Sequence, residues 1–287
     1  MTNPSPPQVF NRPLARQRRE RSGKLFPAHD FLHQRAMEDI IDRLESIRRD
    51  FPCAVFSGAG ELTAKLTPAC GAGAIFSFDS AIARLPGAPA CGALAEEEAP
   101  PLGRETIDLY ASLLTLHGAN DLVGALAQIR RALRPDGLFI AAVFGEETLT
   151  ALKRALYQAE SEITGGVSPR IAPFASVQSF GQALTRAGFA LPVVDVDKIS
   201  VRYEKPLTLF RDLRGMGETA ALMSGGPALR RDVIARAAEI FTEQGGEERF
   251  DIVYLTGWAP HESQQKPLPP GSGRTSLAQA VKDQTTR

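Results

Sequence analysis

Apolar residues recur at two spacings along the chain, and each spacing predicts a different kind of element. In 30–49 they return every three or four positions with charged residues between them, which predicts an amphipathic helix. Further helices are predicted on the same grounds at 121–133, 148–163, 176–188, 206–218 and 228–244. Apolar runs or alternation predict strands at 53–60, 74–78, 107–116, 138–145, 192–203 and 249–260, with a short edge strand near 92–95. The segment TAKLT, 63–67, is expected to begin a helix directly after the first strand.

Strands that alternate with helices and consist of continuous apolar runs indicate a parallel sheet covered on both faces. After residue 146 the pattern changes, and the last two strands suit a long hairpin. We therefore expect an α/β fold with a seven-stranded sheet, an antiparallel strand at its edge, and a helical insertion after the fifth strand. Such sheets bind ligands at the carboxyl ends of their strands.

Composition divides the chain into one long domain and two tails. Residues 1–8 and 264–287 are rich in Pro, Gly, Ser and Gln without apolar periodicity, and both are predicted to be disordered. The domain, 9–263, consists of the N-terminal helix 30–49, a core at 51–145, and the insertion with the C-terminal part of the sheet at 146–263. Six basic residues crowd the first 24 positions and are interpreted as a solvated arm, with contact to a partner or a membrane surface as the alternative. They are Arg12, Arg16, Arg18, Arg19, Arg21 and Lys24.

Charge and cysteine content exclude several function classes. Lysine plus arginine and aspartate plus glutamate each number 33, and this balance argues against nucleic-acid binding, which favours a basic surplus. No run of about 18 apolar residues predicts a membrane span. Cys53, Cys70 and Cys91 form no CxxC pair, which argues against a zinc site and fits a cytoplasmic protein. The sequence therefore offers no metal site.

A glycine turn follows the first predicted strand at Ser57-Gly58-Ala59-Gly60. Glycine lets the backbone approach a ligand closely, and the start of a helix offers free N–H groups. A tight strand-to-helix turn without a ligand has the same sequence, so the turn alone leaves both interpretations open.

The wider pattern resembles a known superfamily. The spacing of the glycine turn, the second strand, the acidic run 96–98 and the strand 107–116 resembles that of class I S-adenosylmethionine-dependent methyltransferases. Later stretches carry a more specific resemblance, to the respiratory complex I assembly factor five family and its bacterial relatives, over about 9–264. These stretches are GGVSPRIAPFASVQSFGQALTRAGF, DLRGMGE and YLTGWAPHES.

The resemblance implies a Rossmann-like methyltransferase fold and a protein substrate, a subunit of complex I. It implies that the protein either modifies this subunit, by hydroxylating an arginine, or chaperones it as a catalytically decayed member. The alternative function is methyl transfer from S-adenosylmethionine to a small carboxylate or thioester, as in a distant relative that methylates a malonyl thioester. Whether the protein is an enzyme stays open at this point.

The resemblance also implies which residues would contact S-adenosylmethionine. They are Ser57, Gly58, Gly60, Ser77, Asp79, Glu96, Glu97 and His117. Three positions depart from the family pattern, because Phe56 replaces an acidic residue, Leu62 replaces a third glycine, and Ser77 stands where a ribose-binding acid is expected. A lost charged hydrogen bond costs about 1.5–3 kcal/mol, so weak cofactor binding is predicted.

Three side chains are candidates for the chemistry itself: His117, Glu218 and Arg170. His117 follows the central strand and is placed to act as a base or hydrogen-bond donor, or simply to cap the next loop. Arg170 and Glu218 lie in glycine-containing loops, 165–170 and 215–218, that are expected to border the carboxyl ends of the strands. There Glu218 would pair with a cationic target side chain, unless Arg170 and Glu218 pair with each other.

Overall fold

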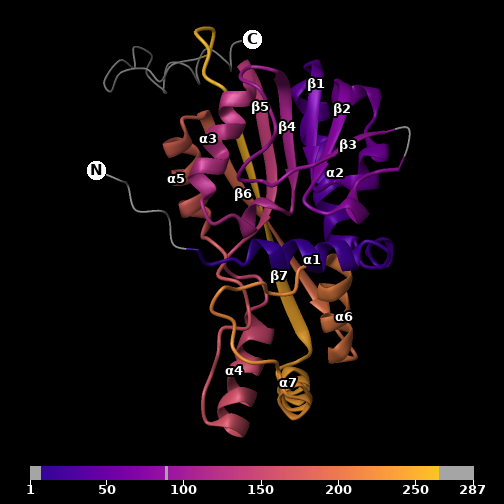
Figure 1. Cartoon of the computed structure of the whole chain (residues 1–287), viewed down its shortest axis with the longest axis vertical. Coiled ribbons are helices and arrows are strands. Elements are labelled where there is room, and N and C mark those ends of the chain that lie inside the picture. The colour runs from indigo at the N-terminus through magenta and orange to yellow at the C-terminus, as the bar shows by residue number, and fades with distance from the viewer. Residues whose placement is uncertain (1–7, 88–89, 265–287) are drawn as a thin grey trace, which may run out of the picture.

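The computed structural model describes residues 8–87 and 90–264 (Figure 1). The predicted tails 1–8 and 264–287 lie outside this range apart from Gln8 and Gln264, so their predicted disorder stays a prediction. Every helix within the range is too short or too polar to cross a membrane.

Seven strands in the described part of the chain form one sheet in the order β3-β2-β1-β4-β5-β7-β6. All neighbours from β3 to β5 are parallel, and β7 is antiparallel to both β5 and β6. The predicted seven-stranded α/β sheet is thus confirmed. The strands are β1 Phe51–Ser57, β2 Ala72–Asp79, β3 Cys91–Leu94, β4 Ile107–Leu113, β5 Leu133–Phe144, β6 Ala190–Arg202 and β7 Glu247–Trp258.

The predicted position of the antiparallel strand is wrong. β7 lies one place in from the edge, and β6 is the edge strand. The reason is visible in the side chains, because β7 is buried on both faces from Phe250 to Leu255. β6 alternates apolar and polar residues, and none of its side chains is fully buried. A strand that is apolar on both faces needs neighbours on both sides, so β7 occupies the interior position.

Helices cover both faces of the sheet, and their side chains make two separate cores. α2 (Phe31–Ile47) packs on one face, where alternate strand residues such as Phe56 and Leu113 point toward it. α3 (Leu122–Ala132) and α5 (Val177–Ala187) cover the other face, which includes Val55 and Tyr110. The two faces alternate along each strand as the strand period requires.

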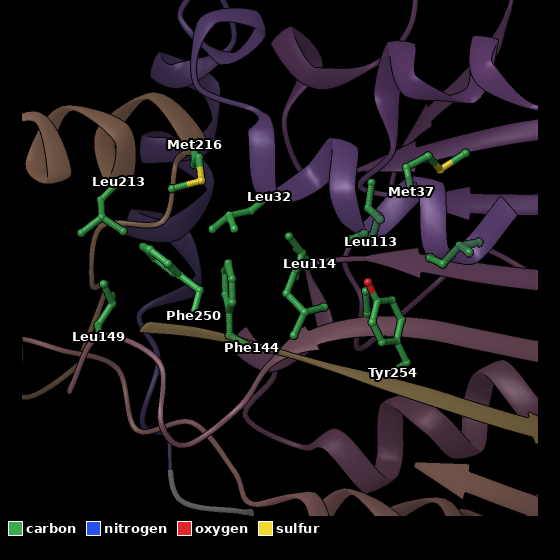
Figure 2. Packing of buried hydrophobic residues seen from close by; sticks show 14 of the residues in the cluster. Leu32, Met37, Leu113, Leu114, Phe144, Leu149, Leu213, Met216, Phe250 and Tyr254 are labelled. Carbon is green, nitrogen blue, oxygen red and sulfur yellow. The ribbon is translucent and has the colours of Figure 1, made fainter. Parts of the chain in front are cut away.

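Three further helices lie beyond the carboxyl ends of the parallel strands. α4 (Thr150–Thr164), α6 (Pro206–Met216) and α7 (Arg231–Glu243) pack around the part of the β6–β7 hairpin that extends past the sheet (Figure 1). The core on the α2 face continues into this region. Figure 2 shows Leu213 and Met216 of α6 near Phe250 of β7, and the same buried cluster contains Leu149.

The long helix expected after the glycine turn is absent from the structure. The chain forms only two short 3-10 turns there, η2 (Gly60–Lys65) and η3 (Pro68–Cys70). Pro68 disfavours helical backbone at the preceding residue, and Thr67 is extended with φ −95° and ψ 161°. No α-helix N-terminus therefore follows the glycine turn within the described residues.

The basic N-terminal segment is a docked helix, so its interpretation as a solvated arm is wrong. α1 (Arg12–Ser22) begins at Asn11, whose side chain accepts a hydrogen bond from the Leu14 amide. The Asn11 amide donates to the Ala221 carbonyl, and Phe10 forms an isolated bridge with Leu222. α1 runs across the carboxyl ends of the strands, between the sheet and the helices beyond it (Figure 1).

We predict that Leu113→Asp prevents folding. Leu113 lies on the middle strand of the sheet and is 2% exposed, and an unpaired carboxylate buried there costs several kcal/mol. The matched control is Leu94→Asp on the edge strand β3, where the side chain is 51% exposed. Circular dichroism melting should show a cooperative transition for the control only. A cooperatively melting Leu113→Asp protein contradicts the placement of this strand.

Candidate functional site

The glycine turn brings the end of β1 against β4. Gly58 and Gly60 both have positive φ, 79° and 51°. A Cβ atom at Gly58 would lie 2.5 Å from the Leu113 carbonyl oxygen, and one at Gly60 would lie 2.5 Å from the carbonyl oxygen of Arg84. Both glycines are therefore required by backbone packing, and this requirement exists without any ligand.

Asp79 ends β2 beside this turn and is bound by an arginine of α1. The guanidinium of Arg19 donates from Nε to Asp79 Oδ1 and from Nη2 to Oδ2, both at 2.8 Å. Asp79 is 1% exposed and Arg19 is 7% exposed. Burial lowers the pKa of Arg19, but the carboxylate of Asp79 more than offsets this and raises that pKa above its ordinary value. The acid that the sequence offered for a ribose is thus held in a buried bidentate ion pair.

A second arginine of α1 holds the acidic run. Arg12 Nη2 donates to Glu96 at 2.6 Å and also to Glu97. Burial raises the pKa of Glu97, and the charge of Arg12 opposes that rise. Glu98 instead accepts a hydrogen bond from the Asn120 amide at 2.6 Å. Glu96 and Glu97, predicted as cofactor contacts, thus face α1 in this structure.

His117 and Glu218 meet on the far side of Arg19. His117 lies in η5 (Leu116–Gly118) after the central strand, and Glu218 follows Gly217, which ends α6 with φ 84°. His117 Nε2 is 3.1 Å from Glu218 Oε2. Burial acts to raise the pKa of Glu218, but the hydrogen bond with His117 and the charge of Arg19 hold it below its ordinary value. This pair joins two of the three predicted catalytic candidates.

One oxygen of Glu218 is left for another partner. Oε1 accepts no hydrogen bond from the described residues, and Arg19 Nη1 lies 3.9 Å away, beyond hydrogen-bond distance. An ionised carboxylate oxygen accepts up to two hydrogen bonds. Glu218 therefore offers an acceptor with its charge already formed.

Two adjoining cavities share the wall that contains Glu218. The smaller, of about 90 Å³, has apolar side chains such as Leu114 in its wall, and is called the polar cavity here for the charged or polar side chains that also line it: Arg12, Arg19, Glu97 and His117. The larger, of about 410 Å³, is mainly apolar and lies between α1, α4 and α6. The residues common to both are Ala172, Phe174, Glu218, Thr219 and Ala220.

Arg170 lies away from the small polar cavity. It donates from Nε to Glu160 Oε1 at 3.1 Å and from Nη1 to the Pro227 carbonyl at 2.7 Å. It lines the larger cavity only, and it makes no ion pair with Glu218. In the second loop, Gly215 lies inside α6, so only Gly217 ends that helix.

The remaining predicted contacts are buried in the sheet. Ser57 and Ser77 lie on the adjacent strands β1 and β2 and line neither cavity. Phe56 and Leu62, two of the departures from the family pattern, are buried in the core on the α2 face. Phe56 and Leu62 therefore add apolar volume to that core.

Arg84 places a third guanidinium beneath α1. It is 4% exposed, donates to the Met216 carbonyl at 3.1 Å, and stacks on the ring of Phe26. Burial, with the nearby charge of Arg19, lowers the pKa of Arg84 to about 9, so the group stays charged at neutral pH. The same surroundings lower the pKa of the buried His33, which is therefore neutral.

S-Adenosylmethionine does not fit in the polar cavity while α1 is docked. Sites for ligands of this size usually enclose about 300–1,000 Å³, whereas the polar cavity has about 90 Å³. Asp79 has both carboxylate oxygens on Arg19, and Glu97 is bound by Arg12. The arginines that fill these positions were missed at the level of sequence. The signal was present, since Asn11 with Pro13 marks a helix start before the arginines.

We predict that substitutions of Arg19 and Asp79 have strongly non-additive effects on the free energy of unfolding. Arg19→Met or Asp79→Leu alone leaves a buried unpaired charge and should lower the free energy of unfolding by about 3–5 kcal/mol. The double variant should lose clearly less than the sum, because an apolar pair replaces both charges. Urea titration measures all three. The exposed pair Arg230–Asp232 is the control and should show about 0–1 kcal/mol, and additive losses at Arg19 and Asp79 contradict the buried pair.

Comparison with known proteins identifies the fold. The family described as "Methyltransferase domain" matches residues 57–141. The YcgJ protein from Bacillus subtilis superposes with a TM-score of 0.53 at 12% identity, over 78% of this chain and 99% of that one. A Bacillus halodurans protein assigned as a methyltransferase gives 0.52 at 11%, over 77% and 99%. These likenesses confirm the Rossmann-like methyltransferase fold.

Several relatives found by sequence share a higher identity with this chain than these solved structures do. The mitochondrial arginine-hydroxylase NDUFAF5 of Danio rerio is 36% identical over 96% of this chain and 90% of its own length. The Homo sapiens protein of the same name is 36% identical over 98% of this chain and 86% of its own. A malonyl-[acyl-carrier protein] O-methyltransferase of Xylella fastidiosa is 34% identical over only 56% of this chain and 54% of its own. The chain belongs to the family of the arginine-hydroxylases NDUFAF5.

Proposed function

We propose that this protein binds an arginine side chain of a respiratory complex I subunit and acts in the assembly of that complex. The observation that carries the proposal is the free carboxylate oxygen of Glu218, which stands beside an internal guanidinium at the wall of two cavities. A carboxylate with a lowered pKa is the natural partner of a guanidinium. The name of the relatives, arginine-hydroxylase, is consistent with this chemistry.

The shape of the two cavities supports a protein substrate. The polar cavity takes up a charged end group, and the apolar cavity next to it suits a neighbouring side chain of the same segment. His117 supports the arrangement by holding Oε2 of Glu218, which leaves Oε1 directed to the incoming group. Arg170 is a wall residue in this proposal, because Glu160 already neutralises its charge.

We also propose that the protein acts in the cytoplasm of its own cell. Its relatives are named as mitochondrial proteins, so this proposal assigns a compartment other than theirs. The support is the state of the cysteines, since Cys53, Cys70 and Cys91 are all free. Free thiols are the usual state in a reducing compartment.

The test is Glu218→Gln in cells that lack the natural copy of the gene. The change removes the charge and keeps the volume, so binding of an arginine-containing target should weaken by about tenfold to a hundredfold. Complex I, measured on native gels, should fall correspondingly. The melting temperature of the protein should drop by no more than about 4 °C, the size expected for ~1–2 kcal/mol in a domain this large.

The matched control is Glu239→Gln. Glu239 is an exposed residue of α7, and the substitution removes the same charge at the surface. It should leave complex I unchanged. Normal complex I in the Glu218→Gln cells contradicts the proposal. Mass spectrometry of the subunit then separates chaperoning from modification. Hydroxylation adds one oxygen atom from dioxygen to a C–H bond, while a two-electron donor and two protons reduce the other atom to water.

The second candidate is methyl transfer to a small carboxylate or thioester, with S-adenosylmethionine as the methyl donor. The observation that favours it is the apolar cavity of about 410 Å³, which is large enough for an acyl chain. The relatives with that activity match a smaller part of the chain than the arginine-hydroxylases do. Transfer of a labelled methyl group to such an acceptor by the purified protein would establish it.

A further inference from the structure

We propose that α1 is a displaceable strap, and that α1 and a nucleoside ligand bind the same edge of the sheet in mutually exclusive ways. In the state described here α1 holds that edge. A nucleoside such as the one in S-adenosylhomocysteine would bind once α1 has moved aside. This inference does not depend on the target of the protein.

α1 binds the same groups that a nucleoside would bind. Vicinal ribose hydroxyls are bound by a carboxylate at the end of β2 in sheets of this kind, and in this structure the carboxylate at that end is Asp79, two residues after Ser77. Both carboxylate oxygens of Asp79 are on Arg19. The Arg19 Nη2 atom also lies 3.5 Å from the Gly58 carbonyl, so its guanidinium lies over the glycine turn itself.

The second anchor of α1 repeats this pattern. Arg12 holds Glu97, a carboxylate that is 5% exposed and that otherwise has the chemistry to accept a hydrogen bond from an exocyclic amino group. The two arginines lie two turns apart on the helix and reach the two carboxylates at once. Together they leave only about 90 Å³ of space at this edge.

The fully buried contacts of α1 are polar or charged, which makes the helix displaceable by a polar ligand. Arg19 and Ser22 are its only fully buried residues, and both are polar. Leu14 only lines the larger cavity. Further hydrogen bonds run to backbone carbonyls. Arg18 Nη1 donates to the Thr219 carbonyl at 3.0 Å and to that of Ala220. When α1 leaves, water or a polar ligand replaces each of these partners.

The arginines of α1 and the carboxylates at the edge of the sheet have opposite charge, and this explains why α1 docks there when no ligand is bound. Without a ligand, the buried carboxylates need cations, and the arginines of α1 supply them from the same chain at high effective concentration. A ligand must offer enough hydrogen bonds to replace both anchors. The departures at Phe56 and Leu62 do not enter this competition, since both side chains are in the core.

The experiment compares binding of S-adenosylhomocysteine by the full-length protein and three variants, using calorimetry. Arg19→Gln and Arg12→Gln each release one anchor, and each should bind the ligand at least about tenfold more tightly than the unmodified protein. Arg21→Gln is the matched control, because it removes the same charge from an exposed position on the same helix. It should bind as the unmodified protein does. If Arg19→Gln fails to fold, the affinity of the milder variant Arg12→Gln for the ligand decides the test.

Trypsin digestion supplies an independent readout, since α1 contains several arginines. Cleavage within 12–24 should accelerate several-fold at saturating S-adenosylhomocysteine. Without ligand it should be faster in Arg12→Gln than in the unmodified protein, which has the same cleavable sites because Pro13 prevents cleavage after Arg12. Two results overturn the proposal. One is that neither anchor variant binds the ligand more tightly than Arg21→Gln does, which includes no binding by any of them. The other is that α1 stays equally protected when the ligand is bound.

Discussion

Buried negative charge at the carboxyl edge of the sheet is the constraint on which the rest of the site depends. Asp79 and Glu97 are 1% and 5% exposed, and an unpaired carboxylate at such depth is destabilising. The chain meets this constraint with guanidinium groups from α1. Charge pairing therefore fixes where α1 lies, and the position of α1 in turn limits the size of the polar cavity.

The placement of Glu218 depends on a different set of contacts. A Cβ atom at Gly215 would lie 2.3 Å from His29 Cδ2, so α6 packs its backbone directly against His29. His29 Nδ1 also binds Asp212 Oδ1 at 2.8 Å, which fixes the same helix by its side chain. The turn at Gly217 then directs the next residue toward His117. The insertion and the Rossmann-like sheet thus each supply one half of the His117–Glu218 pair.

Most of the fold could be predicted because its signals are local. Apolar runs and helical spacing locate every strand and the helices from α2 onward, and the observed bounds differ by a few residues. The sheet edge could not be predicted in the same way, because the order of β6 and β7 depends on pairing between distant segments. The helix predicted after the glycine turn does not form because Pro68 disfavours helical backbone before it. Pro68 is a local signal, and the prediction did not take it into account.

The site was less predictable, because its residues were judged one at a time. Asp79, Glu96, Glu97, His117 and Glu218 do meet at one edge, but they meet around Arg12 and Arg19, which the composition of the N-terminal segment had marked as solvated. A solvated arginine and a buried one have the same sequence signature. A buried arginine is distinguished from a solvated one only by the buried carboxylates that it pairs with. Those carboxylates come together only when the strand ends lie side by side in the fold.

The departures from the family's cofactor motif take on a different meaning in this arrangement. Phe56 and Leu62 add apolar volume on the α2 face, beneath a turn whose glycines already satisfy backbone packing. They therefore leave the sheet intact and lie outside the edge where α1 and a ligand would compete. What remains at the edge is a set of carboxylates that prefer guanidinium groups, as shown by the two that they already hold. The same preference that docks α1 inside the chain equips Glu218, with its free oxygen, for an arginine that comes from outside.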